Sequence, residues 1–106
     1  MIKGDIILIH FPFTDLSGSK LRPAIVLTQN DRDITVCFIT TQFKKRESTD
    51  ISLQPSVENG IKMASLIKVN KIATLDRILA LGKIGSLDAT QLAELNSKLI
   101  QLFQLL

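Results

Sequence analysis

Two kinds of phosphate-binding side chain occur at the ends of apolar segments in the first half of the chain. Arg22 precedes Pro23, where a polar loop meets the apolar run of residues 24–28, and Thr40 and Thr41 close a later apolar run. A planar guanidinium can hold two phosphoryl oxygens at once, and a hydroxyl can donate to another. A guanidinium and a hydroxyl brought together at strand ends could therefore bind a phosphate, although a solvated charge or an ion pair would also explain Arg22.

The two threonines differ in the face of the strand to which they belong. Thr40 alternates with Val36 and Phe38, whereas Thr41 has the opposite parity. Side chains alternate between the two faces of a strand, so only one of the threonines can face a given ligand. Both residues could also be present only because β-branched side chains suit strands.

Candidates for proton transfer are few. Asp15 is the only carboxylate in the loop between the first two apolar runs, and it could act as a base or be an ordinary turn residue. His10 has the usual titration range of a general base. It lies inside an apolar run, however, and a half-buried structural histidine is the simpler interpretation.

Further polar and basic residues could bind a polyanion such as single-stranded RNA. The predicted RNA contacts are Ser17, Ser19, Lys20, Gln42, Lys44, Lys45, Lys68 and Asn70. The lysines would follow the phosphate backbone, and the amides could read base edges. A run such as residues 44–46 is more often a solvated loop, and the amides could be ordinary strand-end residues.

Composition limits the class of protein. The chain has 106 residues, a net charge of +3 and neither Trp nor Tyr, so a single domain over residues 1–106 with little base-stacking capacity is expected. The single cysteine, Cys37, excludes a disulfide framework and a zinc-binding motif, and it predicts a reduced, cytoplasmic protein. We expect no metal, no cofactor and no membrane span.

Hydrophobic patterning predicts short strands followed by one helix. The expected strands are residues 5–11, 24–28, 34–41, 51–54, 63–75 (with a break or bulge at residues 70–71) and 79–84. From Asp88 the period changes to about 3.6, and Asp88 with Gln91 forms a capping-box pattern. The predicted apolar face of the helix comprises Leu92, Leu95, Leu99, Leu102, Phe103 and Leu106. The fold class expected is α+β, mainly β, as a small barrel of antiparallel strands with a C-terminal helix.

Several segments together resemble a known family. They are GDI near the start, FPFT, the Gly/Ser loop, RPAIVL, the ITTQ strand end and SLIKVNKIATLD before the terminal helix. In this order and spacing they are similar to the MazF/PemK toxin endoribonucleases, over about residues 3–105. The resemblance implies an SH3-like barrel of the CcdB/MazF type, a homodimer, a cognate antitoxin and metal-independent cleavage of single-stranded RNA. It also implies that Arg22 and Thr40 are the functional pair.

The chain departs from the family pattern at two places. The loop DLSGSKL has no Glu or His before Arg22, and Lys68 and Asn70 stand where some relatives have Arg and Asp. Two alternatives to an endoribonuclease therefore remain. One is a non-catalytic module that binds RNA or a protein, and the other is an inhibitor of a protein target such as a topoisomerase.

Overall fold

The computed structural model describes residues 1–11 and 20–106 of the chain. These residues form six strands, one short 3-10 helix and one α-helix. In chain order the elements are β1 (Asp5–Phe11), β2 (Lys20–Gln29), β3 (Asp33–Thr40), β4 (Ile51–Leu53), β5 (Ser65–Asp76), η1 (Arg77–Leu79), β6 (Ala80–Ser86) and α1 (Ala89–Phe103).

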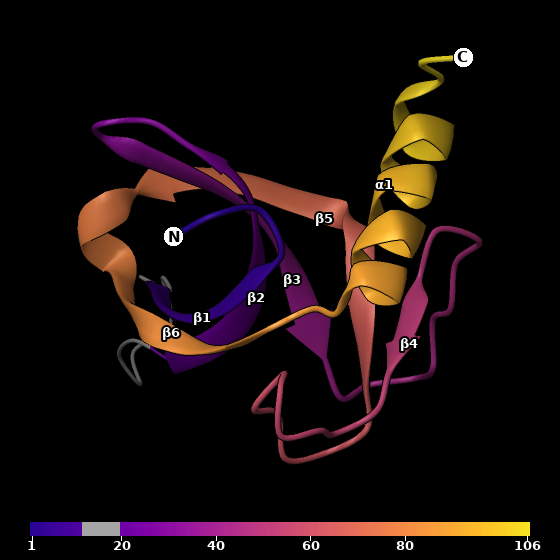
Figure 1. The fold of residues 1–106 in the computed structure, drawn as a ribbon, viewed down its shortest axis with the longest axis horizontal. Helices are drawn as coiled ribbons and strands as arrows, with labels where there is room; N and C mark the ends of the chain where they lie inside the picture. The colour runs from indigo at the N-terminus through magenta and orange to yellow at the C-terminus, as the bar shows by residue number, and fades with distance from the viewer. Residues whose placement is uncertain (12–19) are drawn as a thin grey trace.

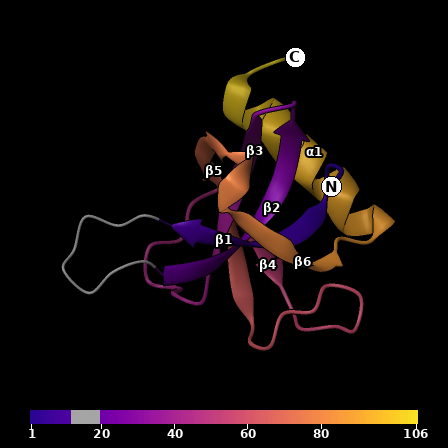
Figure 2. The same ribbon diagram turned by 90° about the vertical axis from the view of Figure 1, so that its left-hand side faces the viewer.

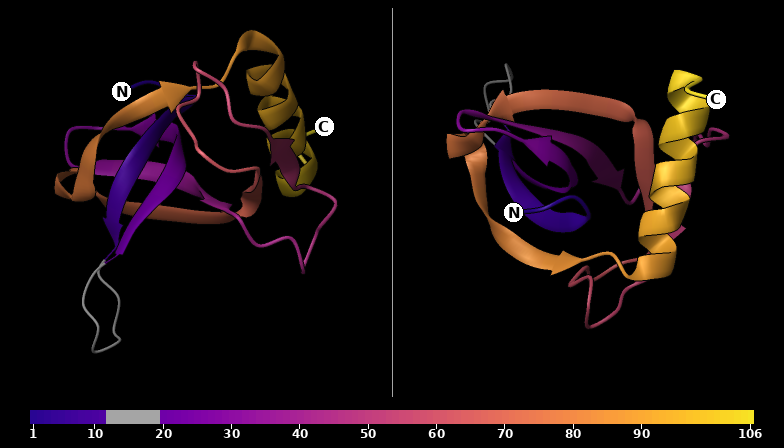
Figure 3. Two further views of the ribbon diagram at one scale, coloured as in Figure 1. Left: turned by 90° about the horizontal axis from the view of Figure 1, so that it is seen from below. Right: turned by 45° about the horizontal axis from the view of Figure 1, so that its top comes forward.

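The six strands form one antiparallel sheet in the order β4-β5-β3-β2-β1-β6. The pairings of β1 with β6, β2 with β3 and β3 with β5 all contain register shifts, and such bulges bend a sheet and increase its twist. The sheet accordingly curls: β5 runs along one side, η1 turns the chain, and β6 returns along the other (Figures 1 and 3). This is the expected barrel-like, mainly β architecture, with β4 and β6 left as the two edges.

Both faces of the curled sheet are buried. On one face, buried residues such as Ile6, Ile25 and Cys37 form a core with Leu95 of α1. On the other, Ile9, Val36 and their neighbours form a second core that is closed by η1 and the start of β6. Adjacent residues of one strand thus contribute to different cores, as the alternation of side chains in a strand requires.

Helix α1 covers the first core beside β4 and β5 (Figures 1 and 2). The predicted capping box is confirmed, because Asp88 Oδ1 accepts the Gln91 backbone N–H and Gln91 Oε1 accepts the Asp88 backbone N–H. Leu95 is fully buried, but Phe103 and Leu106 of the predicted apolar face are exposed, so this face does not belong to the core along its whole length. Only the part of the apolar face that lies over the sheet packs against apolar residues, and the face continues past the edge of the sheet.

The strand predictions were correct in position and differ at their ends. β2 begins at Lys20 rather than after Pro23, because residues 20–23 pair with β1 alone and Pro23 has no strand on its other side. The break expected at residues 70–71 is a bulge inside β5. β6 continues through Gly85 to Ser86, and η1 had no sequence signal that we recognised. No helix among the described residues is long and apolar enough to cross a membrane.

Candidate functional site

The register of β2 and β3 brings Arg22 and Thr40 together. Ala24 of β2 pairs with Phe38 of β3, and these are the last paired residues at this end of the two strands. Continuing that register by two residues on each strand places Arg22 opposite Thr40. Since the step is two residues, both side chains lie on the same face as the Ala24–Phe38 pair. Residues 18 apart in sequence therefore meet at one end of the sheet.

Arg22 and Thr40 line a cavity of about 600 Å³ at this end of the sheet. Its lining residues are Phe11, Arg22, Phe38, Ile39, Thr40, Gln42, Lys44, Lys45, Glu47, Lys68 and Lys71. Five of them are cationic and one, Glu47, is acidic. Phe11 and Phe38 contact each other edge to face, with ring centroids 5.2 Å apart. The lining of the cavity thus combines five cationic side chains with two aromatic rings, a composition suited to a phosphate and an attached base.

The Thr40 hydroxyl is oriented by its own backbone. Its Oγ1 accepts the backbone N–H of Gln42 at 3.1 Å. A hydroxyl has one proton to donate in addition to its acceptor lone pairs. Because an N–H already occupies one lone pair of Thr40 Oγ1, its proton can be donated to an anionic oxygen in the cavity.

The bulge in β5 directs a second group of side chains toward the cavity. Phe38 pairs with Lys68, but the preceding residue of β3, Cys37, pairs with Ile72, so residues 69–71 have no partner on β3. Bulges commonly re-aim side chains next to functional sites. Here both Lys68 and Lys71 line the cavity, although their spacing of three would place them on opposite faces of a regular strand.

Lys68 holds the loop that follows β3. Its side chain is only 10% exposed, and its Nζ donates to the backbone oxygen of Lys45 at 3.0 Å and to Asp50 Oδ2 at 2.8 Å. The Asp50 side chain is 1% exposed and also accepts the backbone N–H of Glu47 at 2.8 Å. A buried ion pair whose atoms make further hydrogen bonds is a rigid connection. The loop over residues 45–50 is therefore fixed to β5.

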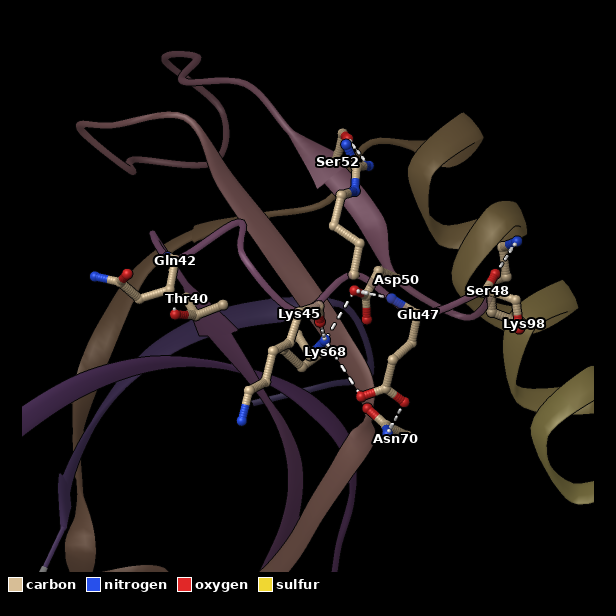
Figure 4. A network of polar contacts seen from close by, with 11 residues as sticks. Thr40, Gln42, Lys45, Glu47, Ser48, Asp50, Ser52, Lys68, Asn70 and Lys98 are labelled. Atoms are coloured by element: carbon tan, nitrogen blue, oxygen red, sulfur yellow. Dashed lines mark hydrogen bonds and ion pairs between the residues drawn. The ribbon is translucent and has the colours of Figure 1, made fainter.

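The same loop is also attached to α1. Lys98 Nζ donates to the backbone oxygen of Ser48 at 2.9 Å, and Gln101 contacts the Ser48 hydroxyl at 3.4 Å. Glu47 extends from this loop toward β5 (Figure 4). There Asn70 Nδ2 donates to Glu47 Oε2 at 2.5 Å, and Lys68 Nζ lies 3.6 Å from Glu47 Oε1. Its side chain is 43% exposed. Glu47 is thus a positioned carboxylate that solvent can reach.

Most of the predicted site residues that the structure describes come together. Arg22, Thr40, Gln42 and the predicted RNA-binding lysines 44, 45 and 68 all line the cavity. Asn70 contacts the cavity residue Glu47 without lining the cavity itself. Lys20 is exposed on β2, away from the lining. Asp15, Ser17 and Ser19 lie outside the described residues. The roles assigned to these side chains stay predictions.

Sequence reasoning missed five contributors to the cavity: Phe11, Phe38, Ile39, Glu47 and Lys71. Each phenylalanine has the same strand parity as the buried residues of the second core, so alternation along the strand could have predicted which face it lies on. Glu47 had no signal, because it follows a basic run that is typical of a solvated loop. His10 is half-buried, has the opposite parity to Phe11 and does not line the cavity.

No group of three or more His, Cys, Asp or Glu side chains arranged to hold a metal ion occurs within residues 1–11 and 20–106. Cys37 is fully buried in the core, and this burial raises the pKa of its thiol to about 12. Such a thiol stays protonated and unreactive at neutral pH.

Comparison with solved structures finds the same fold in several bacterial toxins. The Mycobacterium tuberculosis toxin MazF-mt6 superposes with a TM-score of 0.73 at 21% identity, over 92% of this chain and 96% of that chain. MazF of Deinococcus radiodurans gives 0.75 at 22% identity, over 98% and 96%. An endoribonuclease in complex with its cognate antitoxin, from a mycobacterial species, gives 0.77 at 17% identity, over 100% and 97%. At these identities the likeness concerns the fold.

A search of curated protein sequences gave no significant match. The family comparison is decisive instead: the family described as PemK-like, MazF-like toxin of type II toxin-antitoxin system matches residues 2–103, which is nearly the whole chain. The chain therefore belongs to the PemK-like, MazF-like toxins of type II toxin-antitoxin systems.

Proposed function

We propose that this toxin is an endoribonuclease that cuts single-stranded mRNA in the cytoplasm without a metal ion. The observation that carries the proposal is that Arg22 and Thr40, from neighbouring strands, line one cationic cavity. Family membership supports the toxin role, and two of the similar structures are endoribonucleases by description.

RNA carries its own nucleophile, the 2′-hydroxyl. Attack of the 2′-oxygen on the adjacent phosphorus gives a 2′,3′-cyclic phosphate and releases the 5′-oxygen of the next nucleotide. Negative charge develops on the phosphoryl oxygens during this step. We assign their stabilisation to the guanidinium of Arg22 and the hydroxyl of Thr40, because groups fixed in advance around developing charge are the strongest source of such stabilisation.

The remaining cavity residues suit RNA on either side of that phosphate. Lys44, Lys45 and Lys71 would neutralise neighbouring phosphates and make binding dependent on salt. The aromatic rings of Phe11 and Phe38 would contact a base. The amide of Gln42, also in the lining, has a donor and an acceptor for a base edge, which makes it a candidate for sequence preference.

Two protein partners belong to the proposal. A cognate antitoxin would place an acidic segment over the positive cavity, since charge complementarity favours such an encounter. One similar structure is a mycobacterial endoribonuclease in complex with its cognate antitoxin, and another is a MazE-MazF assembly of Deinococcus radiodurans. A homodimer is expected from the family resemblance. The exposed apolar residues Phe103, Leu105 and Leu106 at the end of α1 are available for such a contact.

The test is cleavage of a long unstructured RNA in EDTA, with the new ends mapped. We expect discrete cuts by the wild-type protein. Arg22→Ala should lower the rate about 10²–10³-fold, the usual effect of removing one donor to developing charge. Thr40→Val should lower it about 10–100-fold, as a lost hydrogen bond to a charged group is worth about 1.5–3 kcal/mol.

Matched controls exist for both variants. Arg32→Ala removes an exposed arginine from the β2–β3 turn, outside the cavity, and Thr41→Val changes the neighbouring exposed threonine of opposite parity. Both should cut at the wild-type rate. Intact RNA after incubation with folded wild-type protein would refute the nuclease proposal. Salt-dependent binding without cutting would then identify the alternative, a non-catalytic RNA-binding module.

A further inference from the structure

We propose that Glu47 is the general base that accepts the proton of the attacking 2′-hydroxyl. This inference rests on the proposed endoribonuclease function and assigns one step of it. Glu47 is the single carboxylate among the described residues that line the cavity, where it accompanies Arg22 and Thr40. Carboxylates are ordinary general bases, and a base must lie on the same surface as the phosphate that reacts.

The loop geometry holds Glu47 in place without burying it. Its backbone N–H donates to Asp50 Oδ2 at 2.8 Å, and its backbone oxygen accepts the Asp50 N–H at 3.0 Å, which closes a tight turn. Lys68 fastens that turn to β5, and Lys98 fastens it to α1. The side chain of Glu47 is nevertheless 43% exposed, so a substrate can reach it.

The two carboxylate oxygens differ in their surroundings. Oε2 accepts a hydrogen bond from Asn70 Nδ2. Oε1 lies 3.6 Å from Lys68 Nζ, beyond hydrogen-bond distance, so its lone pairs can accept a substrate proton. Asn70 and Lys68 are positioning residues in this assignment, because they orient the carboxylate and do not touch the reacting atoms.

Lys68 does not need Glu47 as a counterion, so an ion pair with Lys68 is not enough to explain why a carboxylate lies in this cavity. Lys68 already has two nearer partners, Asp50 Oδ2 at 2.8 Å and the backbone oxygen of Lys45 at 3.0 Å. Its charge is therefore compensated by a carboxylate that is itself buried. Asp50 cannot serve as the base, because its side chain is 1% exposed and is already bonded to Lys68 and to the backbone of Glu47.

In the proposed step the 2′-O–H bond breaks as the 2′-oxygen bonds to phosphorus, and the proton moves to Oε1 of Glu47. The P–O5′ bond breaks, and the departing 5′-oxygen takes a proton from solvent water. Glu47 then returns its proton to solvent. No electrons are transferred, and no other reactant is required. In this assignment Lys68 and Asn70 of β5 orient the carboxylate of Glu47, which belongs to the neighbouring loop.

The first test compares cutting with binding. Glu47→Gln keeps the shape of the side chain, and we expect a 10²–10⁴-fold lower cleavage rate, the usual contribution of a general base. Its affinity for an uncleavable 2′-deoxy analogue should be unchanged or higher, since a negative charge is removed from a positive surface. Glu94→Gln, at an exposed position of α1, is the matched control and should cut normally.

The second test adds a small proton acceptor in solution to replace the missing carboxylate. Sodium formate should raise the cleavage rate of Glu47→Ala at least tenfold, whereas sodium chloride at equal ionic strength should not. Circular dichroism melts would show that both variants fold. Wild-type cleavage together with an equal rate for Glu47→Gln would overturn the assignment and leave the nuclease proposal standing. Wild-type protein that does not cut would overturn both.

Discussion

The pair formed by Lys68 and Asp50 should contribute strongly to stability, and replacing Lys68 by Met measures this contribution. Both side chains are nearly buried, at 10% and 1% exposure, and their Nζ and Oδ2 atoms are 2.8 Å apart. Removing the ammonium leaves the Asp50 carboxylate in the interior without a counterion. Breaking a buried pair in this way costs about 3–5 kcal/mol.

This loss would be a large fraction of the total stability of the protein. A chain of 106 residues is expected to have a free energy of unfolding of about 5–15 kcal/mol. Each kcal/mol corresponds to roughly 4–8 °C in Tm for a domain near this size, so Lys68→Met should melt at least about 12 °C below the wild type. Urea unfolding followed by far-UV circular dichroism is the appropriate assay, because the chain has no Trp or Tyr to report by fluorescence.

Two further variants separate the ion pair from a general effect of the substitution. Lys62→Met makes the same change at an exposed position and should alter stability by less than about 0.5 kcal/mol. The double variant Lys68→Met/Asp50→Asn removes both charges and should be more stable than Lys68→Met alone, because no unpaired carboxylate remains. A loss below about 1 kcal/mol for Lys68→Met, as for a solvated surface pair, would refute this reasoning.

Two other predictions concern the core and a turn. Since burial raises the pKa of Cys37 from 9.0 to about 12, the folded protein holds a proton that the unfolded chain has lost between these pH values, so stability should fall with rising pH by up to about 1.4 kcal/mol per unit. Urea unfolding from pH 8 to 11 would show this slope in the wild type, and Cys37→Ala should lack that part of it. Gly60→Ala should lose more than about 2 kcal/mol, because φ is +69° and a Cβ would meet the Ile84 backbone oxygen at 2.1 Å. Gly82→Ala, where a Cβ meets nothing within 4 Å, should be nearly neutral in the same measurement.

Much of the fold could be predicted from local sequence patterns. Continuous apolar runs located β1 and β3, and the pattern of Asp88 and Gln91 located the start of α1. These signals lie within one element, so a single stretch of chain contains them. The apolar stripe of α1 was extended too far, to Phe103 and Leu106, because periodicity does not tell where the supporting sheet ends.

The candidate site was predictable only in part, for a physical reason. Arg22 and Thr40 lie just beyond the last paired residues of β2 and β3, and the family resemblance had singled out both of them. The position of Glu47 depends instead on contacts between residues 23 apart, from Lys68 to Lys45 and from Asn70 to Glu47. Those contacts require the β5 bulge to direct its side chains toward the loop. The sequence indicated a break or bulge at residues 70–71, but no local pattern encodes which distant residues its side chains meet.

The central claim, that this toxin cuts RNA through the RNA's own 2′-hydroxyl, is tested most directly by one substitution in the substrate. An oligonucleotide containing a mapped cleavage site would be compared with the same oligonucleotide lacking the 2′-hydroxyl on the 5′ side of the scissile phosphate, both in EDTA. We predict that the first is cut, leaving a 2′,3′-cyclic phosphate, and that the second stays intact while binding equally well. Cleavage of the 2′-deoxy oligonucleotide at the same phosphate would contradict the account.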